Sequence, residues 1–263
     1  INEIVFNANG SKIATASQDQ TIKVWDTLTG RMDRSFDVRD EVRSLTYCID
    51  DSIIAAALAD GKIKLLNLGE QESTTLRGHR GQVFSIDYRA NEKQLISLGS
   101  DDTLRFWDIL TGKQLRIMEK NDWKNLPDTM LTDIGFNPKS GEAIVVLTGD
   151  SRYFAHSSDG SMFASKGFDS TVKIWDAKTK TEQATFKAHE KPLQGVWFSQ
   201  DASKLYTFCA AEKSIKIWDI KSRRALKTIP IPLEKPRCCA FHPQGKMFAA
   251  AGGKDICIID LNE

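Results

Sequence analysis

Short runs of alternating apolar and polar residues cover most of the chain, and they predict antiparallel β-strands instead of helices. One kind of run ends in an aromatic residue, as at residues 4–6 and 196–198, and a polar turn follows it. A second kind is rich in small apolar residues, as at residues 247–250. Turn residues separate the runs at intervals of about 8–12 residues, which is typical of all-β folds. No stretch keeps a helical period, so we expect an all-β protein.

The strongest signal is a repeated segment that ends in Trp-Asp. The tryptophans of this segment are Trp25, Trp107, Trp175 and Trp218, and weaker copies place Leu66 and Ile259 at the same point. The separations are 41 residues from Trp25 to Leu66, 41 from Leu66 to Trp107, 43 from Trp175 to Trp218 and 41 from Trp218 to Ile259. A unit of this length that recurs in register indicates a repeat protein in which each copy forms one small sheet.

The repeats resemble those of the WD-repeat family, in which each repeat forms one four-stranded blade of a β-propeller. In that family a His, a Ser or Thr, an Asp and the Trp form hydrogen bonds inside a blade. The resemblance therefore implies structural sets of these residue types. Two sets include a His: His79, Ser97, Asp101 and Trp107, and then His189, Thr207, Glu212 and Trp218, with Glu in place of Asp. Thr15, Asp19 and Trp25 match in the first repeat, whose His would fall just before Ile1, and Ser165, Asp169 and Trp175 match in the fifth repeat without a His.

The physical reason for such a set is the indole N–H, because an unpaired buried donor costs about 1–3 kcal/mol. A Ser or Thr hydroxyl beside the Trp accepts this hydrogen bond, and a His held by a carboxylate continues the chain of bonds. The same residue types form catalytic Ser-His-Asp triads. We favour the structural role, because the hydroxyl faces an indole donor and not a substrate.

The number of repeats predicts a seven-bladed propeller, with six blades as the alternative. We expect residues 1–263 to form a single propeller domain that is part of a longer chain. The fourth repeat is irregular, since Trp107 and Trp175 are 68 residues apart. Strands are predicted at residues 131–136 and 143–147, but residues 151–157 are too few for the strands that should follow. We expect blade four to be incomplete, with part of the native chain absent there, and we expect a strand upstream of Ile1 to complete the last blade.

Charge and cysteine content limit the partners and the compartment. The 36 basic and 35 acidic residues nearly balance, which argues against an anionic membrane or bulk nucleic acid as partner. No apolar run approaches the roughly 18 residues that span a bilayer. Five cysteines form an odd set without a CxxC pair. We interpret them as inert core residues in a reducing compartment, and we expect the protein to be intracellular, in the cytoplasm or the nucleus.

No catalytic motif is present, because the chain lacks GxSxG, P-loop, HExxH and GxGxxG patterns. We therefore expect no enzyme activity, no cofactor, no metal and no small-molecule substrate. Outside the implied sets, the remaining histidines are His156 and His242, near the ends of predicted inner strands. A turn or packing role is expected for both.

Loops and channel mouths carry recognition on a rigid propeller. The residues that precede the inner strands at equivalent positions are Asn2, Arg43, Phe84, Thr132, Gln194 and Arg237. Arg and Phe are favoured at interfaces, so this set is a candidate partner-binding surface, with a solvated funnel lining as the alternative. Trp123, in the loop at residues 119–130, either packs beneath that loop or contacts a partner.

The sequence favours a scaffold or adaptor that binds other proteins or peptides within a multiprotein complex. One alternative is a sensor or regulatory propeller domain of a larger signalling enzyme. Another is an RNA-associated propeller in ribonucleoprotein assembly, for which residues 221–224 are the candidate basic cluster. We do not expect nucleic acid as the main partner, since that cluster follows a Trp-Asp strand as an ordinary turn.

Overall fold

The computed structural model describes residues 1–70, 72–119, 131–136, 139, 143–147, 154–167 and 169–261. The chain divides into two compact units, the first with residues 1–136 and 143–149 and the second with residues 137–142 and 150–263. Helical structure among the described residues is limited to the three-residue 3-10 helix η1 (Ala90–Glu92). No helix in this part of the chain is long and apolar enough to cross a membrane.

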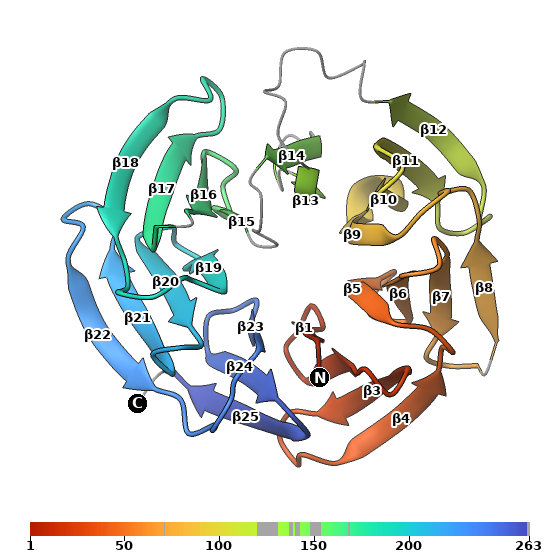
Figure 1. The fold of residues 1–263 in the computed structure, drawn as a ribbon, viewed down its shortest axis with the longest axis horizontal. Helices are drawn as coiled ribbons and strands as arrows, with labels where there is room; N and C mark the ends of the chain where they lie inside the picture. Colours follow the sequence, from red (N-terminus) through yellow and green to blue (C-terminus); the bar gives the residue numbers. More distant parts are fainter. Residues whose placement is uncertain are drawn as a thin grey trace. The chain divides into compact units, whose positions relative to one another are not determined.

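The first unit contains three four-stranded antiparallel sheets and a two-stranded hairpin. Its strands are β1 (Glu3–Phe6), β2 (Lys12–Ala16), β3 (Thr21–Asp26), β4 (Met32–Asp37), β5 (Val42–Cys48), β6 (Ile53–Leu58), β7 (Ile63–Asn67), β8 (Ser73–Leu76), β9 (Val83–Arg89), β10 (Gln94–Gly99), β11 (Thr103–Asp108), β12 (Gln114–Glu119), β13 (Leu131–Phe136) and β14 (Ala143–Leu147). Every strand of a sheet pairs with the next along the sequence. Figure 1 shows β5 and β9 on the inner side of this unit and β8 and β12 on its outer side. We call each such sheet a blade and name it by its strands.

The second unit contains two four-stranded blades and one three-stranded blade. Its strands are β15 (Phe154–His156), β16 (Met162–Lys166), β17 (Thr171–Asp176), β18 (Glu182–Lys187), β19 (Gly195–Phe198), β20 (Lys204–Cys209), β21 (Ser214–Asp219), β22 (Ala225–Pro230), β23 (Cys238–Phe241), β24 (Met247–Gly252) and β25 (Asp255–Asp260). The strand order again follows the sequence. The β23–β25 blade has no fourth strand among the described residues, and the completing strand upstream of Ile1 stays a prediction.

The protein is an all-β propeller, as predicted, but its described residues form six blades and not seven. Among the described residues the fourth repeat supplies the β13–β14 hairpin, so the seven-blade prediction is wrong and the six-blade alternative holds. Residues 148–153, between this hairpin and β15, lie outside the described residues. The sequence analysis also assigned residues 151–157 to the connection, whereas Phe154–His156 form the first strand of the β15–β18 blade.

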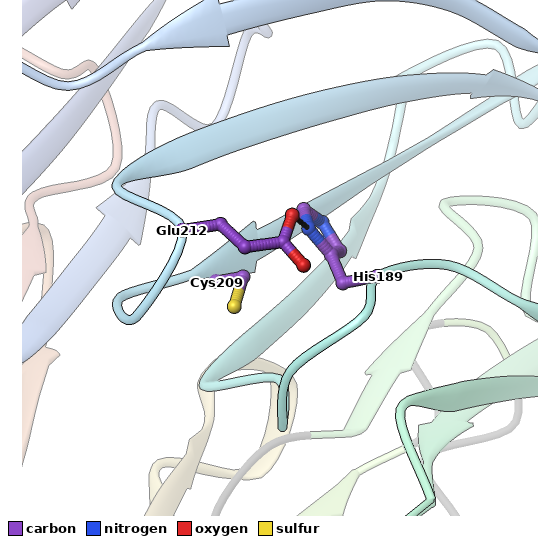
Figure 2. Close-up of side chains that lie close together, drawn as sticks. All are labelled: His189, Cys209 and Glu212. Carbon is purple, nitrogen blue, oxygen red and sulfur yellow. Dashed lines mark hydrogen bonds and ion pairs between the residues drawn. The ribbon is translucent and has the colours of Figure 1, made fainter.

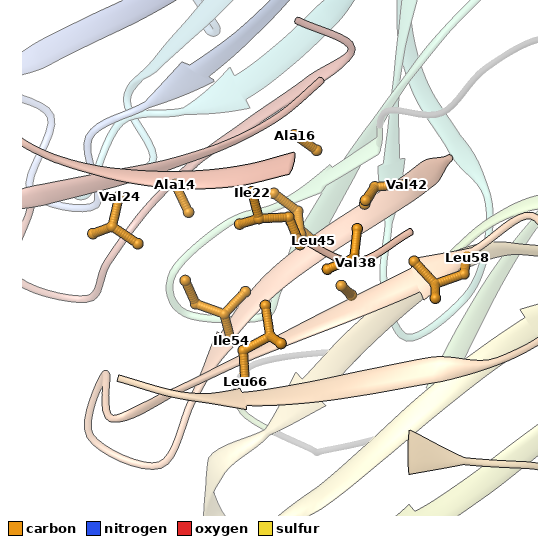
Figure 3. Close-up of a cluster of buried hydrophobic side chains, with 11 residues drawn as sticks. Ala14, Ala16, Ile22, Val24, Val38, Val42, Leu45, Ile54, Leu58 and Leu66 are labelled. Carbon is orange, nitrogen blue, oxygen red and sulfur yellow. The ribbon is translucent and has the colours of Figure 1, made fainter. Parts of the chain in front are cut away.

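The apolar cores lie between neighbouring blades. Figure 3 shows one of them, in which side chains from β2 and β3 meet side chains from β5, β6 and β7. Ile22 from the first blade and Ile54 from the second are both fully buried in it. Small residues such as Ala14 and Ala56 allow the two sheets to approach closely. In the second unit, Phe208 of β20 and Phe248 of β24 pack in the same way between two blades.

The turn between β5 and β6 has an unusual backbone. Ile49, Asp50 and Asp51 have φ angles of 45°, 47° and 64°, in the left-handed region that non-glycine residues rarely adopt. This turn places the Asp51 carboxylate against the neighbouring blade, where it accepts hydrogen bonds from the Asn7 side chain at 3.1 Å and from the backbone N–H of Ala8 at 2.9 Å. The strain is therefore compensated by a bond between two blades.

Candidate functional site

All four Trp-Asp strands hold their tryptophan in the same way. The indole N–H donates to a hydroxyl on the preceding strand of the blade, and the pairs are Trp25 to Thr15 at 2.9 Å, Trp107 to Ser97 at 2.8 Å, Trp175 to Ser165 at 3.0 Å and Trp218 to Thr207 at 2.9 Å. In each blade the strand register pairs the hydroxyl residue with the residue two positions before the Trp. The same register therefore produces the same contact in all four copies, at a spacing of ten residues in three of them and eleven in the fourth.

The β9–β12 blade extends this contact into a chain of four side chains. His79 lies between Ser97 and Asp101, with Nε2 at 2.7 Å from Ser97 Oγ and Nδ1 at 2.9 Å from Asp101 Oδ1. The second carboxylate oxygen accepts the backbone N–H of Arg80 at 2.9 Å. Ser97 is fully buried and Trp107 is 2% exposed, so every bond of the set lies away from solvent or at its edge.

The protonation of this set follows from its charges. Burial by itself would raise the pKa of Asp101, but hydrogen bonds from Arg80, His79 and Thr103 outweigh it and lower the pKa to about 2. Burial lowers the pKa of His79, so the imidazole is neutral at pH 7. An ionised carboxylate only accepts, so Nδ1 donates to Asp101 and Nε2 accepts from the Ser97 hydroxyl. That hydroxyl in turn accepts the indole N–H.

The β19–β22 blade repeats the arrangement with Thr and Glu. His189 Nε2 lies 2.9 Å from Thr207 Oγ1, and Nδ1 lies 2.7 Å from Glu212 Oε2. The other carboxylate oxygen accepts the backbone N–H groups of Glu190 and Lys191 at 2.6 and 3.1 Å. Burial would raise the pKa of Glu212, but the bonds from His189 and Glu190 lower it to about 2. The longer Glu side chain compensates for one extra residue in this turn.

The two blades without a His do not assemble complete sets. In the β1–β4 blade the Thr15 hydroxyl lies 3.4 Å from the carbonyl of Lys23, to which it donates. Asp19 bonds the hydroxyl of Thr21 at 2.6 Å, two residues away. Asp169 bonds Thr171 in the same local way. These carboxylates bond within their own turns, as Asp101 also does with Thr103 at 2.8 Å.

The Ser97–His79–Asp101 geometry matches that of a hydrolytic triad, but its hydroxyl is not available to a substrate. Ser97 Oγ is buried and already accepts the Trp107 indole N–H. Thr207 is in the same position beside Trp218 and is also fully buried. The two sets therefore stabilise their blades and fix the loops that carry His79 and His189.

The structure also brings together a group that the sequence analysis missed. Cys209, the last residue of β20, lies beside His189 and Glu212, and one ligand-type atom from each lies within 4.8 Å of the others. Figure 2 shows the three side chains in the β19–β22 blade. The sequence offered only an indirect signal, because the donors are not arranged in a CxxC or His-Cys motif. That signal is the extra residue between Thr207 and Trp218.

The candidate partner-binding residues of the first unit lie at or before the first strands of their blades. Asn2 precedes β1, and its backbone N–H donates to the Ala16 carbonyl at 2.8 Å. Arg43 is half-buried in β5, with its guanidinium 3.2 Å from the carboxylate of Glu41. Phe84 is half-buried in β9. These three strands belong to consecutive blades, so the residues occupy equivalent places in the repeat.

The remaining candidates fall in the second unit or outside the described residues. Gln194 precedes β19, and its side-chain carbonyl accepts the backbone N–H of Ala210. Arg237 precedes β23 with an exposed side chain. The side chain of Thr132 and the whole of Trp123 lie outside the described residues. Their predicted roles stay predictions.

Two surface pockets lie in the first unit. One has a volume of about 420 Å³ and adjoins the β9–β12 set, with Arg80, Asp102 and Glu119 among its charged lining residues. The other, of about 490 Å³, lies along β4 and includes Arg34, Phe36 and Lys64. Both are open and lined by charges of both signs. The sequence analysis did not anticipate them, because each combines residues from neighbouring strands and turns.

Comparison with known proteins identifies the repeats independently. The pattern of the family described as WD domain, G-beta repeat matches residues 1–26, 70–108, 142–176 and 180–219, which is more than half of the chain. Pre-mRNA-processing factor 19 of Oryza sativa subsp. japonica is 25% identical over 87% of this chain and 38% of its own length. Nuclear distribution protein nudF of Emericella nidulans is 25% identical over 99% of this chain and 59% of its own length. Target of rapamycin complex subunit LST8 of Saccharomyces cerevisiae is 21% identical over 82% of this chain and 79% of its own length.

Proposed function

This chain belongs to the WD domain, G-beta repeat family, and on that basis we propose that it is a non-catalytic scaffold that holds other proteins or peptides in a multiprotein complex. The main observation behind the proposal is that the Ser/Thr-His-acid sets form hydrogen bonds inside their blades. Their hydroxyls are buried against indole donors, so the residues best suited to chemistry serve the blades instead. A relative named as a complex subunit supports the same role.

In each unit, the proposed contact surface is formed by the residues at the beginnings of the first strands. Phe84 in the first unit and Arg237 in the second are the side chains that we expect to contribute most. Aromatic and Arg side chains supply large buried area and directional hydrogen bonds at protein interfaces. Arg237 is exposed and Phe84 is half-buried on a rigid strand, so neither needs a rearrangement of its blade to meet a partner.

Affinity capture tests this assignment. Phe84→Ala and Arg237→Ala are compared with Leu115→Ala on β12 and Lys227→Ala on β22, which remove an apolar and a cationic side chain from exposed places elsewhere in the same units. We expect the first pair to lose co-purifying proteins that the second pair retains, with all four variants equally folded by circular dichroism. If all four variants capture the same proteins in equal amounts, Phe84 and Arg237 do not contact the partner.

The wider proposal fails if no protein accompanies the chain in stoichiometric amount. Nuclease treatment of the captured material separates the RNA-associated alternative, since partners held only through RNA are then released. We also propose an intracellular location. All five cysteines are free, and four of them are buried, which suits a reducing compartment. Labelling of the native protein in intact cells with a membrane-impermeant thiol reagent, compared with lysed cells, tests this.

A further inference from the structure

Three metal-binding side chains converge in the β19–β22 blade. His189 follows β18, Cys209 ends β20, and Glu212 lies in the turn before β21 (Figure 2). The His and Cys side chains are fully buried, whereas the Glu side chain is 21% exposed. Among the described residues, this is the only group of three or more His, Cys, Asp or Glu whose ligand atoms lie close enough to share an ion.

The thiol occupies a place where two other repeats have glycine. Gly99 and Gly167 hold the matching positions, two residues after the blade hydroxyl. A Cβ at Gly99 would lie 2.3 Å from His79 Nδ1, and one at Gly167 would lie 2.5 Å from the carboxylate of Asp169. The extra residue in the β20–β21 turn moves the acid one position further from the hydroxyl, and this leaves room for Cys209. Three departures from the repeat thus occur together: the insertion, the Glu and the Cys.

We propose that His189 Nδ1, Cys209 Sγ and the Glu212 carboxylate bind one divalent ion of the zinc type. Imidazole nitrogen, thiolate sulfur and carboxylate oxygen are the three donors that Zn²⁺ takes in proteins, and thiolate selects against Mg²⁺ and Ca²⁺. Two anionic ligands and one neutral ligand balance the double charge of the ion. The occupied site is therefore electrically neutral, which suits its burial.

The hydrogen bonds of His189 and Thr207 have replacements when the ion binds. Without the ion, His189 Nδ1–H donates to Glu212 and Nε2 accepts from the Thr207 hydroxyl. With the ion, Nδ1 binds the metal through its lone pair and the proton moves to Nε2, which donates to Thr207 Oγ1. The Thr207 hydroxyl then donates to the carbonyl of Lys216, 3.4 Å away. Cys209 loses its thiol proton to solvent, so binding releases one proton overall.

Two features of the surroundings oppose the ion. The Cys209 thiol donates to the backbone carbonyls of Lys191 and Pro192, 3.6 and 3.5 Å from Sγ, and it gives up these bonds when it binds the ion as a thiolate. The opposing charge is Lys216, whose ammonium lies 3.7 Å from Glu212 and 3.2 Å from the Ala188 carbonyl. Because binding releases the thiol proton of Cys209, the affinity for the ion falls as the pH is lowered.

The test uses the tag-free, reduced full chain titrated with Zn²⁺ and, separately, with Co²⁺. We expect one equivalent of Zn²⁺ per chain and a melting temperature higher by roughly 5 °C or more at a hundredfold excess over Kd. Co²⁺ should give a thiolate-to-metal charge-transfer band in the near ultraviolet. Cys209→Ser should lose the band and at least tenfold of the affinity. Cys257→Ser, which removes a half-buried thiol from β25, should leave both unchanged.

The titrations overturn the proposal in any of three ways. Zn²⁺ binding that is equally strong in Cys209→Ser places the ion elsewhere. Co²⁺ binding by the unaltered chain without a thiolate band excludes Cys209 as a ligand, and this result needs no variant to fold. Zn²⁺ that lowers the melting temperature shows that the ion disrupts the His189–Glu212 bond without replacing it.

Discussion

The most direct test of the blade mechanism compares one substitution in two blades. Ser97→Ala and Ser165→Ala both remove a hydroxyl that accepts a Trp indole N–H, at 2.8 and 3.0 Å. The blades differ in what surrounds that hydroxyl. Ser97 is fully buried beside a Trp that is 2% exposed, and it also donates to His79. The partner of Ser165 is Trp175, which is half-buried, and no His is present in that set.

The expected losses follow from the groups that each substitution leaves unpaired. Ser97→Ala leaves two buried groups without a hydrogen-bond partner, the indole N–H of Trp107 and Nε2 of His79. At about 1–3 kcal/mol for each, with some relaxation, the free energy of unfolding should fall by roughly 2–4 kcal/mol. Ser165→Ala leaves only the N–H of the half-buried Trp175 without its partner, and a water molecule can replace the hydroxyl there. The free energy of unfolding should therefore fall by about 1 kcal/mol or less.

Urea unfolding followed by tryptophan fluorescence and by circular dichroism measures both losses. Coincident transitions by the two probes are needed before a free energy is extracted, because two compact units need not unfold together. A Trp107→Phe background provides the control, since without the indole donor Ser97→Ala should cost less. Equal losses for the two serines, or the same loss with and without the indole, would refute the account of these sets.

Three further substitutions have defined expectations. Neither ring nitrogen of His156 has a hydrogen-bond partner among the described residues, and burial lowers its pKa to about 4 from 6.5. As the pH falls, the unfolded chain therefore takes up the proton before the folded chain does, and the free energy of unfolding should decrease between pH 6.5 and 4. In His156→Phe this decrease should be smaller by about 1–2 kcal/mol, as measured by urea unfolding at pH 7.5 and at pH 4.5. Gly252→Ala should lower the melting temperature much more than Gly253→Ala, because a Cβ at Gly252 would lie 1.9 Å from the Lys235 carbonyl oxygen, whereas Gly253 has open space and only a φ of 61°. Asp50→Gly should raise stability by about 1 kcal/mol through relief of its left-handed backbone, and an unchanged unfolding midpoint would contradict the strain.

The strands were accessible from sequence because local spacing determines them, and the His-containing sets were accessible through the resemblance to the WD-repeat family. The predicted strands at residues 131–136 and 143–147 have the same bounds as β13 and β14. A hydroxyl on one strand and a Trp ten residues later are brought together by the hairpin register alone. The blade count was not accessible in this way. A regular period gives the number of repeats, but a repeat becomes a blade only when enough residues remain for its outer strands.

The sites that depend on packing between segments could not be predicted. Asp19 and Asp169 stand at the right spacing for their sets, yet among the described residues each bonds a Thr two residues away and no imidazole. The place of Cys209 beside His189 depends on the length of a turn and on a loop from another strand. Neither distance is encoded in a short motif. The pockets along β4 and beside Asp101 likewise combine neighbouring strands and turns.

Because the cores lie between blades, the segment that is repeated in the sequence differs from the segment that forms one core. A gene duplication copies one repeat, but stability comes from the seam that two consecutive sheets form, as between Ile22 and Ile54. A new copy is therefore useful only if its faces fit the copies on either side. Substitutions in different repeats constrain each other across a seam, whereas the two faces of a single sheet are free to diverge.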